Sequence, residues 1–496
     1  MKKILFVISD LHIGGAYSVP SDPTGRGFRL CTHVDVLASF VRALIMGRSK
    51  TTEKIELVVN GDFLDFLAEE RGVDQEDPET GTKWSPLFNK PVDAAKTLAR
   101  MIDRDQNLFD SLRNFLGAGH RLTLLLGNHD IELSYPSVRR LLITSLDADG
   151  KDFQFIYDGE AYAAGNVLIE HGNRYDEWNV VSHDFLRRER SIQSRNENTP
   201  DIEQIFEAPA GSYLVAGVMN LIKERYPFID LLKPEGEAAV PILLALAPEY
   251  RRHVIEIAGL LCRSRKHRIG KNGLPSFAAD ISDHGELAFD GEQLVQQILR
   301  KRLSSEDVEA LYSGAAGVPD FDVDVDISDV GSNVLWSKIK LLTVSPFQGL
   351  EERLQTLSHV LQAAKGDFSF DTNAESEQYV TAAKRLLKSN FELVIFGHTH
   401  LAKDITFEVG RYINTGTWAD LISLPKILTG IWDAEDRENK QTEFLNNVRI
   451  FVEDMRTSRL KQYLRFRPTY ARVALDEAGH LIEAGLFEYS GEERIS

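Results

Sequence analysis

Six short apolar segments, spread along the chain, each end in a cluster of polar residues that can bind metal ions. The segments cover residues 4–8, 55–59, 122–126, 167–169, 393–396 and 411–413 and consist mainly of Val, Ile, Leu and Phe. Their length and composition predict buried β-strands. The clusters that follow them are SDLH (9–12), NGDFLD (60–65), GNHD (127–130), EHGN (170–173), GHTH (397–400) and NTGT (414–417).

The position of these clusters predicts that they meet in space. In layered α/β folds the ligand crevice lies outside the carboxyl ends of the strands, so segments hundreds of residues apart in sequence can converge there. Six polar clusters at the same ends of six predicted strands therefore indicate one shared site.

The residue types in the clusters suit a site for two divalent metal ions. Two such ions, about 3.5–4 Å apart, need a bridging carboxylate because their mutual repulsion must be offset, and Asp62 is the candidate. Asp10 and His12, two positions apart on an extended strand exit, point to the same side and with His400 could hold the first ion. The candidates for the second ion are Asn128, His171 and His398.

The mixture of imidazole, carboxylate and amide groups also indicates which ions to expect. Such ligands suit Mn²⁺, Fe, Zn²⁺ or Ni²⁺ better than Ca²⁺. The two cysteines, Cys31 and Cys262, lie outside every cluster, which argues against a structural zinc site. We expect two divalent ions, with manganese first and iron, zinc or nickel as alternatives.

His129 lies between two polar residues of the GNHD cluster and could face the substrate instead of the metals. We predict that it is the general acid that protonates the leaving oxygen, and that Asp65 fixes its tautomer. Asp65 could instead cap the following helix, and Asp130 could simply hydrogen-bond its loop. Asn128 and Arg174 are candidates for contacts with a substrate phosphate, although Arg174 could equally be an ordinary surface residue.

The five blocks Asp10-x-His12, Gly61-Asp62-x-x-Asp65, Gly127-Asn128-His129-Asp130, His171 and Gly397-His398-x-His400 resemble the calcineurin-like metallophosphoesterase superfamily. The resemblance covers roughly residues 1–176 and 390–420. It implies a four-layer α/β/β/α sandwich, two divalent ions, and hydrolysis of a phosphoester by metal-activated water. Residues 171–179, HGNRYDEWN, are also similar to the branch that contains UDP-diacylglucosamine pyrophosphatases, which typically has Arg where this chain has His129.

More than 200 residues separate His171 from His398, far more than a connection between strands needs. Apolar residues at spacings of three and four predict that this insertion is mainly helical. We therefore expect an α/β core in two parts, 1–176 and 391–496, with a helical cap at 177–390. Basic residues within 187–195 and 263–271 are either solvated helix faces or surfaces that steer a polyanionic substrate.

The composition and charge of the whole chain indicate the size of its core, its possible partners and its location. The 496 residues are 43% hydrophobic, enough for a large core, and the formal net charge of −18 opposes general attraction to duplex nucleic acid. No apolar run is long enough to cross a bilayer, so we expect no integral membrane segment and a cytoplasmic protein. No motif identifies a protein partner.

We therefore predict a metal-dependent phosphoesterase, with a monoester or a diester as its substrate, such as a nucleotide or a nucleic acid. The sequence leaves three alternative functions open. A nucleotide-sugar lipid pyrophosphatase follows from the HGNRYDEWN likeness, and a manganese-dependent nuclease from GNHD and the basic segments. The third is a binding protein that keeps the fold without turnover.

Overall fold

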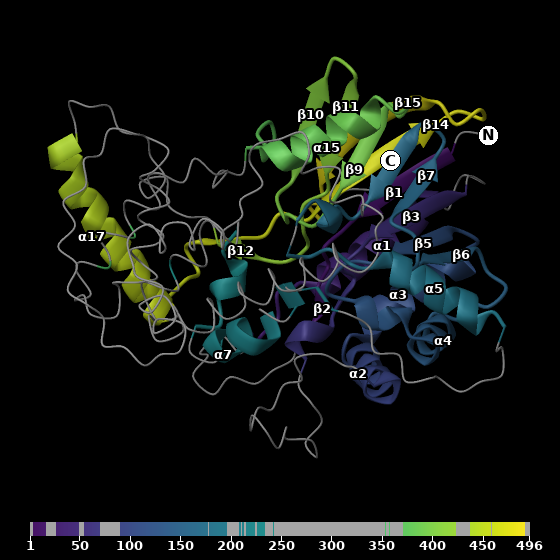
Figure 1. Cartoon of the computed structure of the whole chain (residues 1–496), viewed down its shortest axis with the longest axis horizontal. Helices are drawn as coiled ribbons and strands as arrows, with labels where there is room; N and C mark the ends of the chain where they lie inside the picture. The colour runs from purple at the N-terminus through teal and green to yellow at the C-terminus, as the bar shows by residue number, and fades with distance from the viewer. Residues whose placement is uncertain are drawn as a thin grey trace, which may run out of the picture. The chain divides into compact units, whose positions relative to one another are not determined.

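The protein is described here by a computed structural model (Figure 1). It describes residues 3–15, 26–48, 54–69, 90–176, 178–195, short stretches between 208 and 242, positions 353 and 357, 371–422, 437–457 and 459–491. The chain divides into two compact units. The first comprises 1–239, 366–426 and 450–496, and the second comprises 240–365 and 427–449. The first unit contains both large sheets.

The first sheet has six strands, in the order β15-β14-β1-β3-β5-β6. Strands β1, β3, β5 and β6 run parallel, and β14 pairs with β1 in the antiparallel direction. The last two strands of the chain therefore extend this sheet to its edge. The bounds are β1 Lys3–Ile8, β3 Ile55–Asn60, β5 Arg121–Leu125, β6 Phe153–Ile156, β14 Thr469–Leu475 and β15 Leu481–Glu488.

The second sheet has five strands, in the order β10-β11-β9-β8-β7. Its three central strands, β8, β9 and β11, are parallel and bring segments from both halves of the sequence together. The bounds are β7 Ala161–Ala164, β8 Val167–Glu170, β9 Leu393–Phe396, β10 Lys403–Phe407 and β11 Gly410–Asn414. Two short pairs join distant loops: β2 Ile13–Gly14 with β4 Leu64–Asp65, and β12 Leu421–Ile422 with β13 Leu464–Arg465.

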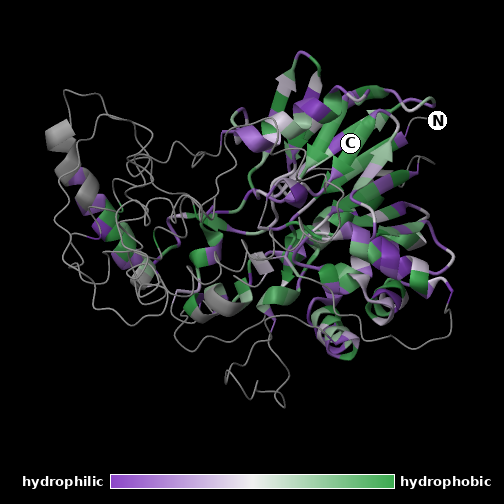
Figure 2. Ribbon diagram, in the orientation of Figure 1, coloured by the Kyte–Doolittle hydropathy of each residue, from purple (hydrophilic) through white to green (hydrophobic). Residues whose placement is uncertain are grey.

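The side chains of β1 alternate between two hydrophobic cores, as the two-residue repeat of a strand requires. Leu5 and Val7 pack with Val167 and Ile395 of the second sheet, in a core between the two sheets. Ile4, Phe6 and Ile8 face the helices α1 Val34–Arg48, α2 Pro91–Arg104, α3 Gln106–Gly117 and α4 Pro136–Ser145. Figure 2 shows the resulting contrast between hydrophobic strands and the hydrophilic outer faces of the helices.

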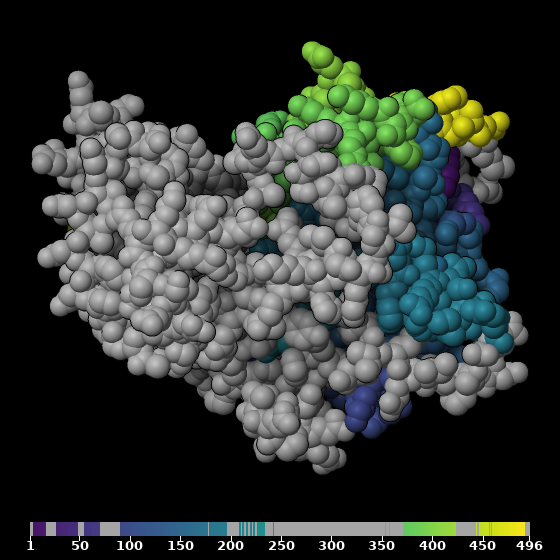
Figure 3. All heavy atoms as spheres, viewed as in Figure 1, coloured from purple at the N-terminus to yellow at the C-terminus, as the bar shows by residue number. Residues whose placement is uncertain are grey.

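The outer face of the second sheet is covered by α15, Glu377–Leu387. Its residues Tyr379, Ala383 and Leu387 pack against Val394 and Tyr412. On the face shown in Figure 3, α15 and β10 (green) and α5 His183–Gln193 (teal) contribute to the surface of this unit. Helices, sheet, sheet and helix thus form the four-layer α/β/β/α sandwich that the resemblance implies.

All six predicted apolar segments are strands, namely β1, β3, β5, β8, β9 and β11. Within the insertion that we expect to be mainly helical, the described residues form α5 and α15. Between them lie a π-helix, Val215–Met219, and α7, Asn220–Lys223. Helix α17, Arg437–Arg456, follows the second sheet in the sequence. Most of the expected cap lies outside the described residues, so the boundaries 177–390 stay a prediction.

The remaining short helices are 3-10 turns at η1 Phe66–Ala68, η2 Ile131–Ser134, η3 Asn173–Tyr175 and η5 Ile229–Leu231. None of the helices in the described part of the chain combines the length and the apolar character that a bilayer crossing demands.

Candidate active site

The polar clusters leave their strands through an unusual backbone conformation. In the described part of the chain, seven residues other than glycine have a positive φ, and five of them belong to the clusters. These are Asp10 (φ 53°), His12 (44°), Asp62 (49°), His398 (68°) and His400 (63°). A positive φ is costly for residues with a side chain and is found where surrounding contacts enforce it, often at functional sites. The backbone therefore turns sharply at the strand ends and directs these side chains to one place.

Hydrogen bonds between the loops hold these turns together. The backbone N–H groups of Leu11 and His12 both donate to the carbonyl of Asp62, at 2.9 and 3.0 Å. The N–H of His398 donates to the Asp10 carboxylate at 2.9 Å, and the N–H of Gly397 donates to the His171 carbonyl at 2.9 Å. The loops after β1, β3, β8 and β9 are thus connected directly.

The described residues contain three groups of metal-type ligand atoms, and the first consists of Asp10, His12, Asp62 and His400. One of the others consists of His12, Asp65 and His129. The two Nε2 atoms of His12 and His400 lie 2.9 Å apart, and His400 Nε2 lies 3.4 Å from Asp10 Oδ1. All four side chains of the first group are buried. Metal–ligand bonds of about 2.0–2.2 Å give separations between neighbouring ligand atoms of roughly 3.0–3.6 Å. The observed distances match such a coordination shell.

Asp62, His171 and His398 form the third group, so that Asp62 belongs to this group and to the first. Asp62 Oδ2 lies 3.2 Å from His171 Nε2 and 3.8 Å from His12 Nε2. The other oxygen, Oδ1, accepts a hydrogen bond from the backbone N–H of His129 at 2.8 Å. One oxygen of Asp62 is therefore fixed by the loop while the other faces both groups of histidines.

Hydrogen bonds determine which ring nitrogen of two histidines faces the site. His171 donates from Nδ1 to the Asn60 carbonyl at 2.8 Å, which leaves the lone pair of Nε2 toward Asp62. His398 donates from Nε2 to the Asp176 carboxylate at 3.0 Å, which leaves Nδ1. Partners of this kind orient histidine ligands in metal sites and raise their basicity.

Several buried polar atoms at this place lack a hydrogen-bond partner. They include Asp62 Oδ2, Asn128 Oδ1, His171 Nε2 and His398 Nδ1. Buried polar atoms without partners are rare and costly in folded proteins. Oxygen and nitrogen atoms that converge in this way are instead the donor set of a divalent metal site. The residues present therefore fit two ions of the expected kind.

Glycines leave the space that the ligand side chains occupy. A Cβ atom at Gly127 would collide with the carboxylate and backbone nitrogen of Asp62. A Cβ atom at Gly61 would collide with the His171 ring, and one at Gly397 would lie 2.6 Å from Asp10 Oδ2. The glycines of the GD, GNHD and GHTH blocks are thus required by close approach between loops.

The electrostatics of the site favour bound positive charge. Burial alone would raise the pKa of the Asp62 carboxyl, but His171 and His129 outweigh it and hold that pKa well below its usual value. Burial would likewise lower the pKa of His171, but Asp62 outweighs it and raises the pKa to about 10. The Asp62 carboxylate therefore attracts a cation strongly. Burial and the nearby Lys233 lower the pKa of His400 well below its usual value, so this ring stays neutral with a lone pair available.

His129 and Asp65 form a separate pair beside the first group. His129 Nδ1 lies 3.2 Å from Asp65 Oδ1, and Asp65 Oδ2 lies 3.6 Å from His12 Nδ1. Burial would raise the pKa of Asp65, but His129 and His12 hold it below its usual value. Asp65 makes no side-chain cap to the helix that follows it. The carboxylate is thus placed to orient two imidazoles, and the side chain of His129 is 16% exposed.

The remaining predicted residues lie at the margin of this arrangement. Asn128 is buried and its Nδ2 donates to Asn179 Oδ1 at 3.4 Å. The Arg174 guanidinium pairs with Glu160, and its contact with a substrate phosphate stays a prediction. The Asp130 carboxylate accepts hydrogen bonds from the N–H groups of Gly127 and Phe63, at 2.7 and 2.8 Å. Asp130 therefore braces two loops, and burial raises its pKa to about 7, helped by Asp62.

Two residues that contact the site were not expected from the sequence. Asp176 binds His398, and Asn179 binds both Asp176 and Asn128. They lie in the HGNRYDEWN segment, which turns back over the site after His171. The signal that could have found them is their position a few residues after a predicted ligand. Asn414, expected to brace the GHTH loop, donates to the Gly397 carbonyl at 2.7 Å.

Comparison with protein families agrees with this geometry. Residues 4–223 match the family described as calcineurin-like phosphoesterase. This chain carries a calcineurin-like phosphoesterase domain. A search of curated proteins found no match to the chain.

The phosphoesterase domain identifies the chain as a metal-dependent hydrolase that acts on phosphoester bonds. The family match ends before the GHTH block, yet the structure places His398 and His400 beside the matched residues Asp10 and Asp62. The candidate site is therefore assembled from both parts of the sequence.

Proposed function

We propose that the chain hydrolyses a phosphomonoester or phosphodiester with two divalent metal ions, held by the ligand groups that meet at Asp62. The single observation that carries this proposal is that Asp62 Oδ2 faces His12 on one side and His171 on the other. A carboxylate that is shared between two ligand groups is the feature that distinguishes a two-metal site from a one-metal site.

The ligands divide into two sets. The first ion would be held by Asp10, His12, Asp62 and His400, and the second by Asp62, Asn128, His171 and His398. Manganese suits this combination of imidazole, carboxylate and amide ligands, as do iron, zinc and nickel. When bound, the two ions supply Lewis acidity toward the phosphoryl oxygens and a source of hydroxide near neutral pH.

His129 would protonate the leaving oxygen. The ring lies outside both ligand sets and is partly exposed, whereas the ligand histidines His12 and His171 are buried. Its Nδ1 is directed to Asp65, so Nε2 is the atom that would hold the transferable proton. The adjacent carboxylate stabilises the protonated imidazole, as an acid catalyst requires.

The chain's other residues would orient the substrate. Asn128 could share its amide between the second ion and a phosphoryl oxygen, since its Oδ1 is unpartnered and buried. Arg174 would have to leave Glu160 to reach a phosphate, so we rank it below Asn128. A nuclease or a nucleotide-sugar lipid pyrophosphatase would use the same metal ligands and the same acid. These activities differ in the part of the substrate that is attached to the scissile phosphate.

The first experiment is hydrolysis of p-nitrophenyl phosphate and bis-p-nitrophenyl phosphate, with Mn²⁺ added or removed by a chelator. The native chain is compared with Asp62→Ala and His129→Ala, and with His480→Ala as the matched control. His480 is exposed in the turn between β14 and β15 and pairs with Asp476. Metal-dependent turnover that Asp62→Ala abolishes, His129→Ala lowers and His480→Ala retains supports the proposal.

Turnover that is independent of metal, or that survives loss of Asp62, contradicts the proposal. Metal content of each variant, measured by plasma mass spectrometry, separates the two roles. Asp62→Ala should lose bound metal, whereas His129→Ala should keep it and lose only turnover. A chain that binds two ions and hydrolyses neither ester would favour the lipid pyrophosphatase or the non-catalytic alternative.

A further inference from the structure

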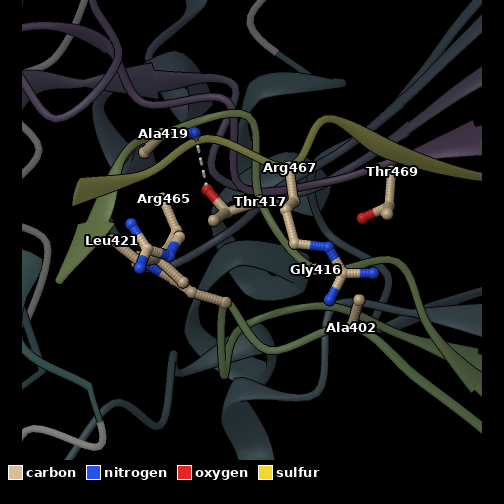
Figure 4. Close-up of a pocket in the computed structure, with 9 residues that line it drawn as sticks. Ala402, Gly416, Thr417, Ala419, Leu421, Arg465, Arg467 and Thr469 are labelled. Carbon is tan, nitrogen blue, oxygen red and sulfur yellow. Dashed lines mark hydrogen bonds between the residues drawn. The ribbon is translucent and has the colours of Figure 1, made fainter. Parts of the chain in front are cut away.

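A small pocket adjoins the metal-type ligand His400 on the side of the C-terminal segment. Residues that line it include Gly416, Thr417, Arg465 and Arg467, as well as His400 itself. Thr417 ties the pocket to the site, because its hydroxyl donates to the Asp10 carbonyl at 2.6 Å. Figure 4 shows the side chains of Arg465 and Arg467 beside this pocket.

The backbone explains why both arginines face the pocket. Leu464 and Arg465 form strand β13, which pairs with β12, and Arg465 lies opposite Leu421. In extended chain, residues two positions apart share one side and the residue between them points to the other. Phe466 accordingly stacks on His33, with ring centroids 3.8 Å apart. This stacking anchors the segment and directs its two neighbours to the pocket.

The charge of Arg465 is not neutralised within the described part of the chain. Its Nη1 donates to the carbonyls of Gln462 and Leu464, at 3.1 and 3.0 Å, and no carboxylate lies within ion-pair distance. Arg467 pairs with Glu488 at 3.1 Å, but these two side chains are 38% and 49% exposed. Such exposed pairs contribute little and are readily exchanged. Arg26, by contrast, is buried and paired with Asp420.

A third cation lies on the same side of the site. Leu232 pairs with Ile422 of β12, and Lys233 is the residue that follows it. Strand β12 also pairs with β13, which contains Arg465. Positive charge thus gathers at one flank of an acidic metal-type site, in a protein with a net charge of −18.

We propose that Arg465 and Arg467 form a subsite for a second phosphate group of the substrate, next to the phosphoryl group that is hydrolysed. A guanidinium fork matches phosphate oxygens and holds them with two parallel hydrogen bonds. The preferred substrates are therefore phosphoesters that carry another phosphate beyond the scissile one. This inference rests on the proposed function, because it describes the substrate of the same site.

The test uses a matched pair of substrates. One is the p-nitrophenyl ester of thymidine 5′-phosphate, and the other is the same ester with a 3′-phosphate. The native chain with Mn²⁺ should show a kcat/KM at least fivefold higher for the 3′-phosphorylated ester. In the double variant Arg465→Gln/Arg467→Gln the ratio should fall to near one. Arg459→Gln, which removes an exposed arginine paired with Asp454, is the control for the loss of a surface arginine and should keep the native ratio.

A second variant and a binding measurement complete the test. Arg465→Lys keeps the charge but loses the planar fork, so its ratio should lie between those of the native chain and the double variant. Calorimetric titration with thymidine 5′-phosphate and thymidine 3′,5′-bisphosphate gives the same comparison without turnover. If no ester is hydrolysed, the proposed function fails and the titration alone decides the subsite. The same ratio in the native chain and the double variant, including a ratio near one in both, overturns the proposal.

Discussion

Nε2 of His12 lies 2.9 Å from Nε2 of His400, although 388 positions separate the two residues in the sequence. Imidazole nitrogens this close can direct their lone pairs at one point, which a bound cation would stabilise. A metal ion held by His12 and His400 would therefore link the loops after β1 and β9. Folding and metal binding should be coupled at this place.

Chelation should lower the melting temperature of the native chain, and Mn²⁺ should restore it. A ligand present at 100 times its dissociation constant stabilises by about 2.7 kcal/mol. With an unfolding entropy of about 2.1 cal/mol/K per residue, that corresponds to a shift of roughly 3–5 °C for a unit of this size. Differential scanning fluorimetry measures the shift. His400→Ala should lose most of it, whereas His480→Ala should keep it, and an equal shift in both variants argues against metal at His400.

His129→Ala should slow hydrolysis most for substrates with poor leaving groups. An acid catalyst contributes about 100- to 10,000-fold, but p-nitrophenolate leaves with little help from a proton. The loss in kcat should therefore be larger for an alkyl phosphoester than for the p-nitrophenyl ester. Asp65→Asn should also lower kcat for both substrates, but by a smaller factor than His129→Ala. Equal losses on the two leaving groups would show that His129 positions the substrate and does not donate a proton.

The strands and the side chains at their ends could be predicted because each strand carries its own local signal. The apolar run identifies the strand, and the carboxyl end identifies the edge where ligands gather, so Asp10, Asp62 and His171 follow from sequence. Asp176 and Asn179 could not be predicted in this way. Their contacts depend on how the loop after His171 turns back, which no periodic pattern encodes.

The pocket at Arg465 and Arg467 was also beyond prediction from the sequence. β13 has only two residues, and its pairing with β12 depends on the path of the chain between them. The choice of ring nitrogen in each histidine was unpredictable for a related reason. The partners of His171 and His398 are a backbone carbonyl and Asp176, and neither belongs to a ligand block.

Gly127→Ala should disrupt the metal site without a general loss of folding. The new Cβ would collide with the Asp62 carboxylate and force it out of position. Displacement of a catalytic group by about 1 Å can cost on the order of 100-fold in rate, and bound metal should fall as well. The control is Gly117→Ala, at the exposed end of α3, where a Cβ would contact nothing within 4 Å.

Hydrolytic activity and bound metal are measured for both glycine variants, the metal by plasma mass spectrometry. Gly117→Ala should keep native metal content and activity. If Gly127→Ala also keeps both, the close approach between the GNHD loop and Asp62 is not required for the site.

Asp420→Asn should destabilise the protein at neutral pH, because Asp420 joins the N-terminal loop to the segment that carries Thr417. Its carboxylate pairs with Arg26, and it accepts hydrogen bonds from His33 and Thr32 at 3.1 and 3.0 Å. Burial would raise the pKa of Asp420, but His33 and Arg26 outweigh it and hold that pKa below its usual value of 3.8. Removing one member of a buried ion pair costs about 3–5 kcal/mol in the free energy of unfolding.

The pH dependence of this loss has a definite sign. The pKa of Asp420 is lower in the folded state than in the unfolded state. Its contribution to the free energy of unfolding is therefore complete at pH values above the unfolded-state pKa, and is lost as the pH falls through the folded-state pKa. The difference between the native chain and Asp420→Asn, measured by urea unfolding, should therefore be constant near pH 7 and shrink below about pH 4. Asp147→Asn removes an exposed partner of Lys151 and should leave the free energy of unfolding close to that of the native chain. A difference for Asp420→Asn that persists undiminished to pH 3 would mean that the side chain acts through packing and not through its charge.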